Sequence, residues 1–139
     1  MQMSFALEAE GAGIARAREA AADFLMQMQA AHGVAVPAHV REVTQLVVSE
    51  LVTNARKYAP GPVLLQVRVA AAGVEVVVWD SDPVLPVARA TDALRVGQHG
   101  LEIVTALTQS LAAERVPGGK RVSARIANTG TEDDACGDR

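Results

Sequence analysis

The feature that most constrains the fold is a long amphipathic segment that stops at Pro60-Gly61-Pro62. Apolar residues recur every three or four positions between residues 38 and 59, which predicts one helix with a single buried stripe. Proline cannot continue a helix, so the chain must turn at this point. The apolar stripe consists of Val40, Val43, Val47, Leu51, Ala55 and Tyr58.

Three polar residues, Glu50, Asn54 and Lys57, form a second stripe along one edge of the apolar one. An Asn oxygen suits Mg²⁺, a Glu can accept a proton near a terminal phosphate, and a Lys can neutralise phosphate charge. The second stripe therefore indicates a metal-nucleotide site. The alternative is a plain border of polar side chains beside the core, because the pattern is short.

The rest of the chain alternates between helical and extended patterns. A near-continuous apolar run at 74–79 is typical of a central strand, and the polar stretch 83–97 is long enough to predict a functional loop that closes over a ligand. The order predicts an α+β fold, a two-layer sandwich of a mixed, mostly antiparallel sheet with about three helices on one face. The expected elements are strands at 3–7, 63–69, 74–79, 111–116 and 121–127, and helices at 14–31, 38–59 and 101–111.

Length and charge limit the organisation and the class of partner. Residues 1–127 of the 139 form one expected domain, and residues 128–139 form an acidic tail that is expected to be disordered. The tail accounts for the whole net charge of −3, and the body has no run of Lys and Arg, which argues against nucleic acid. A single cysteine, Cys136, and the lack of a long apolar run predict a cytoplasmic protein without a membrane span.

Two further positions have the chemistry of a nucleotide site. Asp80 ends the central strand, where a carboxylate can accept a hydrogen bond from the exocyclic amine of a purine; an Asx-turn within its own loop is the alternative. Gly97 and Gly100 precede a predicted helix, where glycines let the backbone approach a phosphate and the first amides point at it. Each signal is weak alone.

The combination of four motifs is much more specific than its parts. They are E-L-V-T-N-A-R-K-Y at 50–58, V-E-V-V-V-W-D at 74–80, G-Q-H-G-L-E-I-V at 97–104 and P-G-G-K-R-V at 117–122. In this order they resemble the histidine-kinase-like ATPases, the GHKL group, from about residue 3 to residue 127. Within the group, the chain is most similar to short actinobacterial regulatory proteins related to anti-sigma-factor serine kinases. The resemblance implies a Bergerat-type ATP-binding fold.

The resemblance also implies roles for single residues. Glu50 matches the general base, and Asn54 matches the residue that binds Mg²⁺. The strand-end Asp80 matches the contact to the adenine amine. The full set of residues expected to bind the cofactor is Asn54, Lys57, Asp80, Gly97, Gly100 and Leu101.

The implied function is that of an ATP-binding regulatory protein, with ATP and Mg²⁺ as cofactors. It would phosphorylate an anti-sigma antagonist on serine or threonine, or bind a sigma factor, and a homodimer is compatible with it. The alternative is a non-catalytic nucleotide-binding or protein-docking switch. Two departures favour the alternative: residues 81–83 replace a glycine-containing turn, and Arg121 stands where relatives often carry a small hydroxyl residue.

Overall fold

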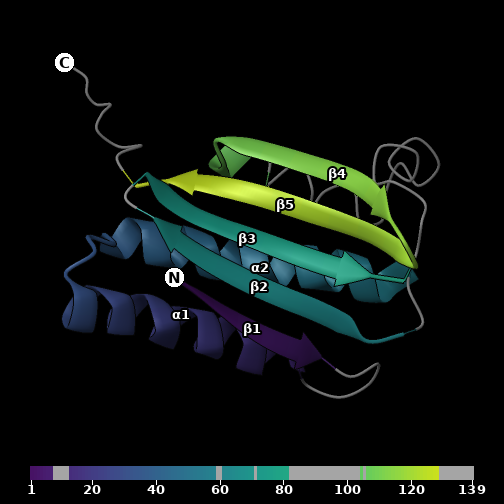
Figure 1. The fold of residues 1–139 in the computed structure, drawn as a ribbon, viewed down its shortest axis with the longest axis horizontal. Coiled ribbons are helices and arrows are strands. Elements are labelled where there is room, and N and C mark those ends of the chain that lie inside the picture. Colours follow the sequence, from purple (N-terminus) through teal and green to yellow (C-terminus); the bar gives the residue numbers. More distant parts are fainter. Residues whose placement is uncertain (8–12, 59–60, 71, 82–103, 105, 129–139) are drawn as a thin grey trace.

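The computed structural model describes residues 1–7, 13–58, 61–70, 72–81, 104 and 106–128. Within them, five strands form one sheet, and two long helices lie side by side against one of its faces (Figure 1). The predicted α+β two-layer sandwich is therefore confirmed. The elements are β1 (Gln2–Leu7), α1 (Gly13–His32), α2 (Ala38–Tyr58), β2 (Val63–Ala70), β3 (Gly73–Asp80), β4 (Ser110–Val116) and β5 (Gly119–Ala127).

The sheet has the strand order β1-β2-β3-β5-β4, and every pairing is antiparallel. It is thus antiparallel throughout rather than mixed. The expected helix at 101–111 lies mostly outside the described residues, although 104, 106 and 107 are helical. Its expected end at residue 111 is wrong, because Ser110 already pairs with Arg125 in the sheet.

The core forms where the inward face of the sheet meets the two helices. The apolar stripe predicted for α2 is buried from Val40 to Ala55, and α2 packs against β2, β3, β5 and α1. Alternate residues of the strands meet it, as the two-residue period of a strand requires. Among the described residues, no helix is both long and apolar enough to cross a membrane.

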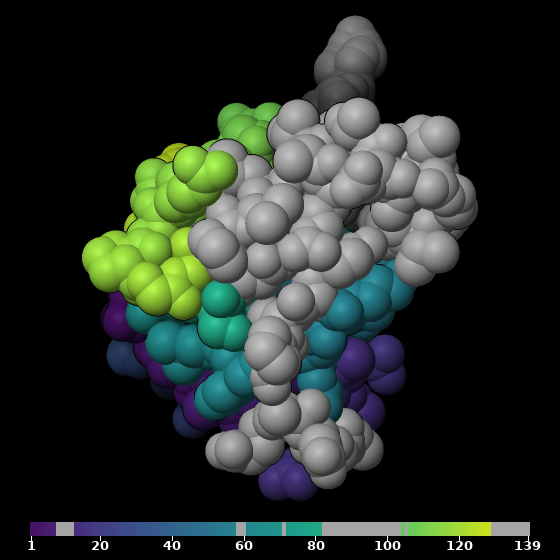
Figure 2. Space-filling model, turned by 90° about the vertical axis from the view of Figure 1, so that its right-hand side faces the viewer, coloured from purple at the N-terminus to yellow at the C-terminus, as the bar shows by residue number. Residues whose placement is uncertain are grey.

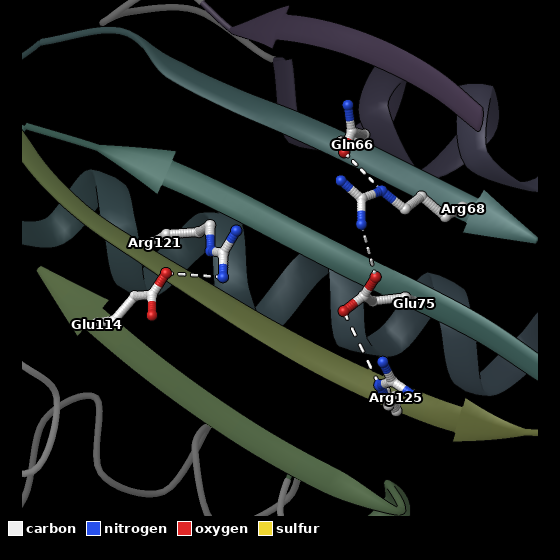
Figure 3. A network of polar contacts seen from close by, with 6 residues as sticks. All are labelled: Gln66, Arg68, Glu75, Glu114, Arg121 and Arg125. Carbon is white, nitrogen blue, oxygen red and sulfur yellow. Dashed lines mark hydrogen bonds and ion pairs between the residues drawn. The ribbon is translucent and has the colours of Figure 1, made fainter. Parts of the chain in front are cut away.

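The opposite face of the sheet carries a network of polar and charged side chains. Arg68 donates to Gln66 and contacts Glu75, which also lies 3.9 Å from Arg125, while Arg121 pairs with Glu114 on the neighbouring strands (Figure 3). These side chains stand on the face away from α1 and α2. Partly exposed pairs of this kind add little to stability, so the inward face carries most of the energy of folding.

One charged pair lies on the inward face. Asp80 at the end of β3 is directly opposite Lys120 near the start of β5. The Lys120 Nζ lies 3.0 Å from Oδ1 and 2.9 Å from Oδ2 of Asp80, and the two side chains are only 2% and 1% exposed. Gly119 permits this approach, because a Cβ at that position would collide with the Asp80 backbone carbonyl. Two buried charges are tolerated here because each neutralises the other.

We predict that Asp80→Asn lowers the free energy of unfolding by about 3–5 kcal/mol, because it removes the carboxylate that neutralises the buried Lys120 ammonium. The matched control is Arg121→Gln, which breaks the neighbouring Arg121–Glu114 pair, whose side chains are 38% and 57% exposed. That change should cost less than about 1 kcal/mol. Urea denaturation of both variants and the wild type measures the difference, and equal losses would contradict the burial of the Asp80–Lys120 pair.

Candidate functional site

The candidate site lies at one end of the sandwich. Strand β3 runs toward this end and finishes at Asp80, β5 begins here, and α2 reaches the same end with its last turns (Figure 1). Figure 2 looks onto it, and shows the end of β3 between the β4–β5 hairpin and nearby parts of α2 and β2. The register of the sheet and the direction of α2 thus bring the helix motif and the strand-end carboxylate to one side of the molecule.

The polar stripe of α2 crosses from the core to the surface. Asn54 is buried, with 9% of its surface exposed, whereas Glu50 is half-buried and Lys57 is exposed. Thr53, which the helical period directs away from the core, is exposed. The burial of Asn54 favours the interpretation as a site over that of a plain polar border, because an amide serving only solubility would face water.

The Asn54 amide has no hydrogen-bond partner within the part of the chain that the structure describes. Its nitrogen and oxygen are not among the fully enclosed polar atoms that lack a partner in the described chain, so the amide is open to water, an ion or a ligand. The amide oxygen fits Mg²⁺, which binds through one or two protein oxygens and keeps phosphate and water as its other ligands. No group of three or more His, Cys, Asp or Glu among the described residues could hold a metal, and this mode of binding does not need one.

Glu50 and Lys57 lie on either side of Asn54 along α2, two helical turns apart from each other. No ion pair joins them or engages either one with the rest of the described chain. Glu50 is only partly covered, so its carboxylate is open to a ligand at the surface. This placement is compatible with a proton acceptor beside a bound phosphate group.

Asp80 is where the sequence predicts it, buried at the end of β3. Its partner was not predicted. The carboxylate reaches across to β5 and is held by Lys120. The residues beyond Ser81 that an Asx-turn would involve lie outside the described part of the chain.

Lys120 is the site residue that sequence reasoning missed, and Arg121 is the one that it misplaced. Side chains of β5 alternate, and Lys120 shares the inward face with Val122 and Ala124. Arg121 points to the opposite face, where its Nη2 lies 2.7 Å from Glu114. The alternation of side chains along β5 could have predicted the burial of Lys120, because Lys120 lies two residues before the apolar Val122 and so shares its face.

The remaining predicted residues, Gly97, Gly100 and Leu101, lie outside the described part of the chain, and so does the loop 83–97. Their roles at the phosphates stay predictions. Ser81, the first residue of the unusual turn after β3, is exposed.

Comparison with known proteins identifies the family of this chain. Residues 9–126 match the model of the histidine kinase-like ATPase domain. Curated proteins gave no match. Among solved structures, the histidine kinase AdeS of Acinetobacter baumannii is similar, with a TM-score of 0.50 and 16% identity over 91% of this chain and 68% of that one. At this identity the likeness concerns the fold alone. Because the family model matches residues 9–126 of the 139, the chain belongs to the histidine kinase-like ATPase domain family.

Proposed function

We propose that the protein is an ATP-binding regulatory protein that phosphorylates an anti-sigma antagonist on serine or threonine, or binds a sigma factor. Membership of the histidine kinase-like ATPase domain family supports an ATP-binding regulatory role. The observation that carries the proposal is the buried, unengaged Asn54 beside the half-buried Glu50, at the end of the fold where β3 finishes.

In the proposed reaction, the hydroxyl oxygen of the partner's serine attacks the γ-phosphorus of ATP. The bond from that phosphorus to the β–γ bridging oxygen breaks, ADP leaves, and the hydroxyl proton passes to the Glu50 carboxylate. Asn54 would offer its amide oxygen to Mg²⁺, which neutralises charge on the phosphates when bound. Lys57 would add a positive charge at the rim, and Gly97, Gly100 and Leu101 would contact the phosphates.

We predict that Asn54→Ala weakens Mg-ATP binding by about tenfold or more, because it removes the proposed metal ligand. Binding of ATP in excess chelator should change much less, because that binding does not involve the metal. Calorimetric titration with and without Mg²⁺ measures both. The control is Thr53→Ala on the exposed side of the same turn, and a loss of the same size in the metal-free titration would remove Asn54 from the metal site.

We predict that Glu50→Gln keeps nucleotide affinity and slows phosphoryl transfer by about 10²-fold or more, on the scale of general-base effects. The amide keeps the size of the carboxylate but cannot accept the proton. Transfer from labelled ATP to a candidate anti-sigma antagonist is the measurement, with Glu42→Gln, exposed on the same helix, as the control. Transfer at the wild-type rate in Glu50→Gln would show that another group takes the proton.

One observation favours the second candidate, a switch that docks a partner without catalysis. The Asp80 carboxylate, the proposed contact to the base, is already held by an ammonium group and is almost fully enclosed. Titration of the wild type with Mg-ATP separates the two functions. Binding at micromolar to millimolar concentrations supports the kinase, and its absence at millimolar ligand leaves the protein-docking switch.

A further inference from the structure

A cavity of about 250 Å³ lies at the end of the sheet opposite Asp80. It is formed by the start of β1, the end of β2, the start of β3 and the end of β5, which the register of the sheet brings side by side. Among the described residues, the charged side chains in its lining are Arg68, Glu75 and Arg125. They form one row across three neighbouring strands, on the face away from the helices (Figure 3). The row therefore carries one positive charge more than Glu75 can neutralise.

Arg125 is the less engaged of the two arginines. Arg68 donates to Gln66 at 2.9 Å and to Glu75 at 3.1 Å, whereas the Arg125 Nε lies 3.9 Å from Glu75. The Arg125 side chain is 65% exposed, and its guanidinium makes no hydrogen bond within the described residues. A guanidinium has five N–H donors in a fork that matches a carboxylate. The cavity thus offers an open binding group for an acidic side chain.

The chain itself carries an acidic segment that starts beside this cavity. Residues 129–139 follow Asn128, whose backbone N–H donates to the carbonyl oxygen of Ala72, a residue of the cavity lining. This tail accounts for the whole net charge of −3, and its acidic residues are Glu132, Asp133, Asp134 and Asp138. Opposite charges are therefore joined by a short tether.

The tail is long enough to reach the arginines. Arg125 precedes Asn128 by three residues of β5, which is about 10 Å along the strand. Glu132 follows Asn128 by four residues, which span at most about 14 Å, and Gly130 between them suits a tight turn. A tether this short keeps the acidic groups at an effective concentration in the millimolar range. Exposed ion pairs, which are weak between separate molecules, can then hold the tail in place.

We propose that residues 129–139 fold back over the outer face of the sheet, with their carboxylates at the cavity beside Arg125 and Arg68. The contact requires no helix or strand in the tail, because it depends on charge. It is independent of the nucleotide site, which lies about 23 Å away along β3. A tail in this place is an internal cover, because an acidic segment of another protein could reach the same arginines only by displacing it.

The chain's single cysteine, Cys136, lies in the tail and allows the contact to be measured in the whole chain. A nitroxide spin label on Cys136 broadens the NMR signals of backbone amides that the tail approaches. We expect broadening at Arg68, Glu75 and Arg125, and none at Glu19, which is exposed on α1. Raising the salt from about 0.1 M to about 1 M should remove the broadening, because the screening length falls from about 10 Å to about 3 Å.

A matched set of variants tests the charge at the cavity. Arg125→Gln should reduce the broadening about twofold or more, and Arg125→Lys, which keeps the charge, should retain it. The control is Arg121→Gln, which removes the same charge from the same face of β5, four residues away. That change should leave the broadening at its wild-type level.

Absence of broadening along this row at low salt would overturn the inference, and would leave the cavity open to a separate acidic partner. Equal broadening in Arg125→Gln and the wild type would overturn it as well. The last arm mixes the spin-labelled chain with an isotope-labelled Cys136→Ser chain. Broadening as strong in this mixture as within one chain would show that the tail docks on a second copy, and would contradict the fold-back.

Discussion

The contact between the Asp80 carboxylate and the Lys120 ammonium ties together the two central elements of this fold. It joins β3 and β5 at the end where α2 also finishes, and it is the place where the inward face is charged rather than apolar. A shift of one residue in the pairing of these strands would turn Lys120 to the outer face and bring Arg121 inward. The longer guanidinium would then have to fit beside the core, so the ion pair and the register depend on each other.

Helix α2 has to serve the core and the candidate site with the same few turns. Its apolar stripe packs across three strands, and its neighbouring stripe carries Glu50 and Asn54. Because the helix is held by the core along its length, the two side chains have little freedom to separate. The Asn54 amide makes no hydrogen bond within the described chain, and a polar group left open in this way is typical of positions that are kept for binding rather than for packing.

Much of this arrangement could be predicted from the sequence, and the failures have physical causes. The stripe of α2, the strands predicted at 63–69 and 74–79, and the burial of Asp80 follow from local periodicity, which tertiary structure here reinforces. The partner of Asp80 could not be predicted from its neighbours, because it depends on which residue of β5 lies opposite. The expected helix end at residue 111 was wrong for a related reason: pairing with Arg125 draws Ser110 into the sheet against its helical pattern.

The direction of the strands has one more consequence, for how the protein can be handled. Met1 accepts a hydrogen bond from Val69, and Asn128 donates one to Ala72. Both ends of the described chain therefore leave the sheet at the end of the strands that lies opposite Asp80. The length of β3 puts about 23 Å between that end of the sheet and the Asp80–Lys120 ion pair. A fluorophore, affinity tag or surface anchor attached at the N-terminus would therefore stand clear of the candidate site. The N-terminus is therefore a suitable attachment point for immobilised or fluorescence-based binding measurements.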